Sequence, residues 1–453
     1  MTEQFSGVSR RQRPEVLAPA GNLATLKTAF DFGADAVYCA GKEFGMRTAP
    51  QNFSLADFAE AVSYAHPRGG RVYVTCNILP SSDEVAAMNA YMAQLAEIGV
   101  DGLIVTDIGV LMAARKVAPN TEIHISTQAG ITNYQAANAF AELGASRVVL
   151  ARELSLADIR EIRAHTPPEL EIEAFVHGSM CMAFSGRCLI SKHTTGRDAN
   201  HGDCVQSCRY RYHVVEERNP NEFIPVEITD GGTFIFNSND MNMVEHVDDV
   251  LDAGVTSLKI EGRAKSAYYV AAMANAYKTA VNEYLQQRGF IDAAGAELRA
   301  FHDQVNLPAD AAPAAPTPVQ FSPWLAEEPF KVTHRTYSTG FYYPEQPASE
   351  EVKVGGYINT WLLAGVVTKY DAAAGRLWLQ AKNKITPGTE IEFLFPGAAP
   401  VKYLVPATGL TDSAGEPVAE INYPTREFSI PCPHPIPVGA MVRVPSNRTR
   451  RVG

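Results

Sequence analysis

One short phrase recurs four times in the first 260 residues, a glycine followed within a few residues by an apolar run. The four copies begin at Gly33, Gly99, Gly144 and Gly254. A glycine just after a helix commonly ends it in the left-handed conformation, and a short, continuously apolar run is typical of a strand buried on both faces. The repeat therefore predicts helices and buried parallel strands in alternation.

Other segments supply the remaining strands and helices of this pattern. Further strands are predicted at Glu15–Ala20, Arg71–Cys76, Glu122–Ser126, Glu171–Val176 and Thr233–Phe236. Helices are predicted at Asn22–Phe32, Leu55–His66, Ser82–Ile98 and Ala264–Leu285. This alternation, which continues over about 270 residues, favours a (β/α) barrel of the TIM type within the α/β class. An open, doubly wound parallel sheet is the alternative that the pattern leaves.

The chain changes character near residue 305. The Pro- and Ala-rich stretch over 306–330 can neither continue a helix nor build a core. Beyond it, short alternating segments such as 376–380 and 441–444 are separated by Gly, Pro and Asp turns, as in a small all-β barrel or sandwich. We therefore expect a catalytic barrel over 1–305, a linker over 306–330 and a C-terminal β-barrel domain over 331–453.

Polar residues stand where several predicted strands end. A TIM barrel builds its active site at the carboxyl ends of its strands. A single polar strand end carries little information, since loops are polar anyway. Several such ends on one rim nevertheless predict an active site there. The residues concerned are Asn77, Gln128, Arg152, His177, Lys259, Glu261 and Arg263.

Four of the seven cysteines crowd into 28 residues directly after the strand predicted at Glu171–Val176. They are Cys181, Cys188, Cys204 and Cys208, within a Cys-rich segment over 177–213. In a reducing compartment such crowding indicates metal ligation rather than disulfides. Four thiolates suit zinc or a [4Fe–4S] cluster, and six residues between the first two cysteines favour the cluster over zinc without excluding zinc.

The charge balance limits the partners that the chain can attract. The net charge is −11, so any contact with a nucleic acid must come from a local basic patch. Two regions qualify, the surroundings of the cysteines, with Tyr210 and Tyr212 available for base stacking, and the C-terminal end. No apolar stretch is long enough to cross a bilayer, so we expect a cytoplasmic protein. The cations of the two regions are Arg187, Lys192, Arg197, Arg209 and Arg211 with His193, His201 and His213, and Arg443, Arg448, Arg450 and Arg451.

Three runs of sequence resemble one known family. They are Phe175–Cys188, Arg152-Glu153-Leu-Ser and Leu258–Ser266. The chain resembles the collagenase-like peptidases of the U type, and within them the branch that forms 5-hydroxyuridine at the wobble position of tRNA. The resemblance implies a (β/α) barrel and a small β-barrel, an iron–sulfur cluster on the four cysteines, and hydroxylation that does not use molecular oxygen. Prephenate is the implied cosubstrate, tRNA the implied partner, and electron-delivery or cluster-assembly proteins are further partners.

We hypothesise two groups of site residues on this basis. Cationic side chains would bind a small dicarboxylate such as prephenate, since guanidinium and carboxylate groups pair through two parallel hydrogen bonds. A second group would supply hydrogen bonds or proton transfer beside a flipped uridine. The first group is Arg47, Arg152, Lys259 and Arg263, and the second is Asn77, Gln128, His177 and Glu261.

Other activities remain open from the sequence. A peptidase would need a nucleophile such as Cys39 or Cys76 beside His124 or His177, although a lone cysteine near a buried strand is usually a small core residue. Neither a Gly-x-Ser-x-Gly elbow nor a His-Glu-x-x-His helix is present. Looser resemblances suggest a hydroxylase that acts on rRNA or on a ubiquinone precursor.

Overall fold

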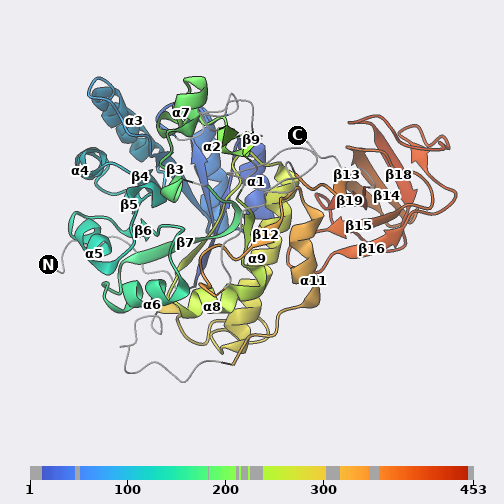
Figure 1. Ribbon diagram of the computed structural model, residues 1–453. Coiled ribbons are helices and arrows are strands. Elements are labelled where there is room, and N and C mark those ends of the chain that lie inside the picture. The colour runs from blue at the N-terminus through green and yellow to red at the C-terminus, as the bar shows by residue number, and fades with distance from the viewer. Residues whose placement is uncertain are drawn as a thin grey trace.

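Eight parallel strands close into a barrel in this computed structural model, which describes residues 13–45, 52–181, 183–210, 214–215, 223–224, 238–302, 317–345 and 357–446. The strands follow one another around the barrel in chain order, and pairing of β11 with both β7 and β1 closes it. This closure excludes the open sheet and confirms the predicted barrel (Figure 1). The strands are β1 (Glu15–Pro19), β2 (Ala36–Ala40), β3 (Arg71–Cys76), β4 (Gly102–Val105), β5 (Glu122–Ile125), β6 (Arg147–Val149), β7 (Glu171–Ser179) and β11 (Ser257–Ile260).

Helices cover the outside of the barrel, and the sequence sets where they begin and end. Side chains of Asn22, Ser54, Asp107, Asn133, Ser155 and Ser266 cap six helices by accepting a backbone N–H. All four repeated glycines have positive φ, between 89° and 100°, as the repeat predicts. The helices are α1 (Leu23–Asp31), α2 (Leu55–Ala65), α3 (Val85–Ile98), α4 (Ile108–Val117), α5 (Tyr134–Glu142), α6 (Leu156–Ala164), α8 (Val247–Asp252) and α9 (Ala267–Gln287).

The Cys-rich segment is an insertion between β7 and β11. It forms short helices, and α7 lies beyond one end of the barrel in Figure 1. The chain returns through β10 (Asp240–Asn242), which pairs antiparallel with the end of β7. The strand predicted at Thr233–Phe236 lies outside the described residues. The remaining elements here are η4 (Phe184–Gly186), α7 (Ile190–Thr195), η5 (Ala199–His201), η6 (Ser207–Arg209), and the paired strands β8 (Val214–Val215) and β9 (Phe223–Ile224).

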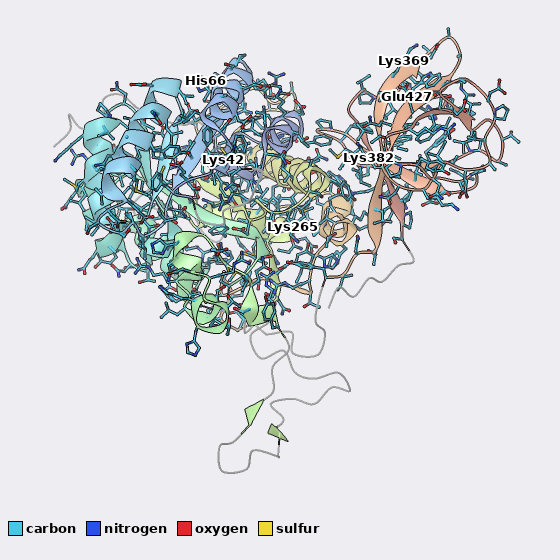
Figure 2. The ribbon with its side chains drawn as sticks, turned by 90° about the horizontal axis from the view of Figure 1, so that it is seen from above. Lys42, His66, Lys265, Lys369, Lys382 and Glu427 are labelled. Carbon is cyan, nitrogen blue, oxygen red and sulfur yellow. The ribbon has the colours of Figure 1, made fainter. Side chains whose placement is uncertain are left out.

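The second domain is a separate antiparallel sheet of seven strands, as predicted. It has a core of its own, in which Leu377, Ile391, Phe393 and Phe428 are buried. The strands are β13 (Trp361–Asp371), β14 (Arg376–Ala381), β15 (Glu390–Leu394), β16 (Val401–Leu404), β17 (Thr411–Asp412), β18 (Glu427–Pro431) and β19 (Met441–Pro445). Figure 2 shows this domain beside the barrel, with Lys369, Lys382 and Glu427 on it and Lys265 on the side of the barrel that faces it.

The connection between the domains differs from the predicted linker. Part of the stretch 306–330 forms α11 (Pro323–Glu327) and η9 (Glu328–Lys331), and Leu325 is fully buried in the barrel's core. The strand β12 (Tyr337–Ser338) pairs with β10 and so extends the barrel's sheet. Residues 317–338 therefore pack with the barrel, because apolar side chains such as Leu325 outweigh the Pro- and Ala-rich composition. Residues 303–316 lie outside the described part of the chain.

Candidate functional site

A cavity of about 140 Å³ lies at the carboxyl ends of the barrel strands, under the Cys-rich segment. Its lining brings together residues from seven barrel strands or the loops that follow them, and from the insertion. Ten of the twelve site residues predicted from the sequence line this one cavity. They are Asn77, Gln128, Arg152, Lys259, Glu261, Arg263, Cys181, Cys188, Cys204 and Cys208.

One wall of the cavity carries buried cations. Nζ of Lys259 lies 2.6 Å from Oε1 of Glu173, inside the barrel, and 4.4 Å from the centre of the Tyr38 ring. Arg152 donates to the backbone oxygen of Ser179 and lies 3.5 Å from Oε2 of Glu261. Glu173 balances the charge of Lys259, and Arg152 and Arg263 stand against Glu261 alone, so this wall carries a surplus of positive charge. An anion is therefore the ligand that it suits.

The neighbouring wall is neutral and rich in hydrogen-bonding groups. Asn77 Nδ2 donates to Oε1 of Gln128 at 3.1 Å, and Thr106 Oγ1 donates to the backbone oxygen of Asn77. Thr75 also lines the cavity, and its buried Oγ1 has no hydrogen-bond partner among the described residues. The sequence argument missed Thr75, although strand alternation places it on the same face of β3 as Tyr73, two residues before Asn77.

The four cysteines form the remaining part of the lining. Burial raises the pKa of Cys208, as does its proximity to the other three thiols, while Arg209 lowers it. The backbone N–H of Ile190 points to Sγ of Cys188 at 3.3 Å, and that of Gln206 to Sγ of Cys204 at 3.4 Å. Hydrogen bonds of this kind stabilise thiolates. Within the described part of the chain, no three His, Cys, Asp or Glu side chains are grouped closely enough to hold a single metal ion.

Three contacts hold the Cys-rich segment over the barrel. Oε1 and Oε2 of Glu153, just after β6, accept hydrogen bonds from N and Oγ of Ser185 at 2.7 and 2.8 Å. The backbone N–H of Leu79 donates to the backbone oxygen of Asn200. Arg209 donates to the hydroxyl of Tyr357, just before the second domain, at 2.7 Å. The segment is therefore anchored on the barrel and on the residues that lead into the second domain, which the sequence did not reveal.

His177 is not part of the cavity lining. Phe175 pairs with Lys259, but His177 pairs with Ile260, so β7 holds one extra residue at this point. Such a β-bulge shifts the alternation of side chains by one residue. His177 therefore contacts Tyr277 of α9 and Tyr337 of β12, and burial lowers its pKa to about 3. This geometry does not support the role in proton transfer that we predicted for it.

Other predicted residues fall outside the site or form pairs elsewhere. Arg47, Arg211, Tyr212, His213, Arg448, Arg450 and Arg451 lie outside the described residues. Lys192 and Arg197 form ion pairs with Asp198 and Asp203. Arg443, predicted in a basic tail, is fully buried between Glu328 and Glu392. It is therefore not available to a nucleic acid.

The two cysteines that a peptidase would use are buried core residues. Cys39 and Cys76 are both fully buried, and burial raises the pKa of both thiols, that of Cys76 to about 12. A thiol with a raised pKa is a poor nucleophile. His124 is also fully buried, and its Nε2 lies 2.9 Å from Glu122.

No helix in the described part of the chain combines the length and apolar character that crossing a membrane requires.

Comparison with known proteins places both domains. Residues 21–351 match the model of peptidase family U32, and residues 359–443 match that of the peptidase family U32 C-terminal domain. The chain is 36% identical over 390 residues to tRNA hydroxylation protein P1 of Bacillus subtilis, which covers 85% of this chain and 84% of that protein. It is 35% identical over 310 residues to tRNA hydroxylation protein P of Escherichia coli, covering 60% of this chain and 68% of that protein.

The name of a third relative refers to a different RNA, 23S rRNA. The chain is 37% identical over 277 residues to the 23S rRNA 5-hydroxycytidine synthase of Escherichia coli, covering 61% of this chain and 40% of that protein. The two matched family models together cover most of the chain. This chain belongs to peptidase family U32.

Proposed function

We propose that this protein is an iron–sulfur RNA hydroxylase that converts uridine to 5-hydroxyuridine at the wobble position of tRNA. The observation that carries the proposal is one cavity lined by four cysteines, a cationic wall and a neutral amide wall. The names of relatives at 35–37% identity, which describe hydroxylation of tRNA and rRNA, support an RNA substrate. The larger share of the tRNA relatives that is covered favours tRNA over rRNA.

The donor set of the cysteines suits a [4Fe–4S] cluster. A mononuclear zinc ion holds four sulfurs about 2.3 Å from one point, and the described residues show no such convergence. A cluster is larger and takes a thiolate at each corner, which suits four cysteines spread around one cavity. The backbone donors to Cys188 and Cys204 would stabilise such thiolates. When bound, the cluster would supply one-electron chemistry.

The cationic wall would bind a small dicarboxylate, for which prephenate is our candidate. Replacing hydrogen by hydroxyl at C5 of uridine is a two-electron oxidation. Without molecular oxygen, the oxygen atom would come from another hydroxyl donor, and the two electrons would pass to an external electron-carrier protein. Prephenate would act as the source of the hydroxyl group or as a required cosubstrate. Arg152, Lys259 and Arg263 would hold its carboxylates, while Glu261 would accept a proton.

The neutral wall would orient the target base. Oε1 of Gln128 is engaged by Asn77, so its Nε2 is the group that can donate to a carbonyl of the base. Thr75 offers a buried hydroxyl without a described partner. A flipped uracil carries two carbonyl oxygens and one N–H, and these groups match a wall made of hydroxyl and amide groups.

Nucleoside mass spectrometry of total tRNA tests the activity. A strain that lacks the gene should lose 5-hydroxyuridine and its derivatives, and the wild-type gene should restore them. Single Cys→Ser changes at positions 181, 188, 204 and 208 should not restore them, and anaerobically purified variants should lose the brown colour and absorption near 400 nm of the cluster. Cys432→Ser, in the core of the second domain, is the matched control. Unchanged tRNA in the deletion strain would refute the proposal.

Changes of growth condition and strain test two further parts of the proposal, the independence from molecular oxygen and the requirement for prephenate. If molecular oxygen is not the oxygen source, strictly anaerobic cultures should contain the hydroxylated nucleoside at the aerobic level. If prephenate is required, a strain blocked before prephenate should lose the nucleoside, and one blocked after it should keep it. Loss under anaerobic conditions would contradict oxygen independence, and persistence in the first blocked strain would contradict the role of prephenate.

A further inference from the structure

A turn at the edge of the cavity presents an exposed aromatic ring. Ala183, Ser185 and Gly186 all line the cavity, whereas the side chain of Phe184 between them is 50% exposed. Burial of an aromatic side chain is normally favourable. A phenylalanine that faces solvent at the mouth of a cavity is therefore a candidate for contact with a ligand.

The turn is held in one conformation despite an unfavourable backbone. Ser185 has φ 45°, a left-handed conformation that residues with a side chain rarely adopt. Both carboxylate oxygens of Glu153 accept hydrogen bonds from Ser185, as described above, and so hold it there. Cε1 of Phe184 lies 3.2 Å from the position that a Cβ on Gly130 would take, two residues after Gln128. The ring is thus fixed beside the neutral wall.

An exposed cation, Arg187, stands three residues after Phe184 in the same turn. Arg187 is exposed, and none of the residues that the structure describes forms an ion pair with it. Lys192 and Arg197 in the same segment are neutralised by Asp198 and Asp203. Arg187 is therefore the cation of this segment best able to bind an anionic group of a ligand.

We infer that Phe184 stacks on a nucleobase of a single-stranded RNA loop and that Arg187 contacts a phosphate of that loop, so that one nucleotide enters the cavity. The inference rests on the proposed RNA substrate and names the residues that hold it. An exposed ring accepts the face of any base, and an adjacent guanidinium suits the phosphate backbone. An apolar surface of a protein partner could cover Phe184 but would offer no anion to bind Arg187.

Binding of an anticodon stem-loop with uridine at the wobble position tests this surface. The holoprotein is titrated anaerobically against a fluorescent stem-loop. Loss of one base stack corresponds to roughly a 5- to 150-fold weaker Kd, which we expect for Phe184→Ala, whereas Phe184→Trp should bind within about twofold of wild type because an indole also stacks. Phe330→Ala is the matched control, because Phe330 is also 50% exposed but lies on η9.

Salt dependence tests Arg187 separately. Loss of one phosphate contact to a single strand lowers the slope of log K against log salt concentration by about 0.7, and we expect this change for Arg187→Gln. A wild-type affinity and slope in the Phe184→Ala and Arg187→Gln variants would overturn the inference while leaving the proposed function intact. Failure of the wild-type protein to bind the stem-loop would overturn both. Unchanged RNA binding with slower reduction of the cluster by a ferredoxin would assign the surface to an electron donor and also overturn it.

Discussion

Two buried ion networks in this molecule have the same composition but different geometry. Inside the barrel, Arg147 lies between Glu15 and Glu173, and Lys259 pairs with Glu173. Between the domains, Arg443 lies between Glu328 and Glu392, and Lys331 pairs with Glu392. The buried part of each network contains two acids and two bases, all at most 9% exposed, and Lys331 also reaches the exposed Glu327 at 3.3 Å. Each buried part is therefore electrically neutral, as a buried group of charges must be.

The two arginines use their donors differently. Arg443 engages both carboxylates with Nε, Nη1 and Nη2, and although burial lowers its pKa, the contact with Glu328 raises it above the ordinary value. Arg147 makes its hydrogen bonds through Nη1, and its Nε and Nη2 have no hydrogen-bond partner among the described residues. Unsatisfied buried donors are unfavourable. The barrel network is therefore less well optimised for stability.

The two networks also differ in where their lysines lie. Lys259 lines the cavity at one end of the barrel network, whereas Lys331 belongs to the interface between the domains. The interdomain network fixes how the second domain sits on the barrel, through residues more than 50 positions apart in sequence. The barrel network gives up some stability and holds a cation at the site. Local rules of protein stability are commonly broken where function needs it.

The largest expected effect comes from the fully satisfied arginine. Arg443→Ala leaves Glu328 and Glu392 buried with Lys331 as their remaining cation. Breaking a buried ion pair by removing one partner typically lowers the free energy of unfolding by about 3–5 kcal/mol. We expect this loss in urea denaturation, with faster proteolysis between the domains. Arg426→Ala, an exposed arginine paired with Asp412, is the control and should change stability by less than about 1 kcal/mol. An equally small loss of unfolding free energy in both variants would show that the interdomain network does not stabilise the fold.

Replacing the lysine of each network should give the next largest loss of stability, and only one of the two changes should also affect activity. Lys259→Met and Lys331→Met each remove a charged hydrogen bond, which is worth about 1.5–3 kcal/mol of stability. Only Lys259 lines the cavity, so only Lys259→Met should reduce 5-hydroxyuridine in complemented cells by more than its loss of folded protein explains. Quantitative immunoblots correct the nucleoside level for protein abundance. Equal nucleoside levels per folded molecule in both variants would contradict the distinction.

The sequence predicted the barrel and most of the cavity because both follow from local patterns. A capping glycine and an apolar run mark a helix end and a strand within seven residues, and strand ends in a closed barrel must meet. Arg443 was placed in a basic tail because its partners lie 51 and 115 residues away. His177 was placed at the rim because a β-bulge leaves no mark in one sequence, since it depends on pairing with β11. Long-range pairing is the information that local patterns lack.

His177 shows a third way to bury a titratable group, and its effect on stability is the smallest and depends on pH. The networks bury charges in pairs, whereas burial lowers the pKa of His177 to about 3 and keeps it neutral. An unfolded histidine has a pKa of about 6.5. Between these values the unfolded state binds a proton that the folded state does not, so stability falls as pH falls. The slope reaches about 1.4 kcal/mol per pH unit below pH 6.5 and vanishes above it.

Replacing this histidine should remove that slope without touching the ion networks. We expect the urea midpoint of His177→Asn to fall less than that of the wild-type protein between pH 6 and pH 5, by the equivalent of about 1.2 kcal/mol. Between pH 7.5 and pH 8.5 the two proteins should show parallel behaviour, because the histidine is neutral in both states there. Parallel curves at acid pH as well would mean that His177 takes up a proton in the folded protein. The nearby Asp240 would then outweigh the desolvation of a buried imidazolium, which the neutral hydroxyls of Tyr277 and Tyr337 do little to offset.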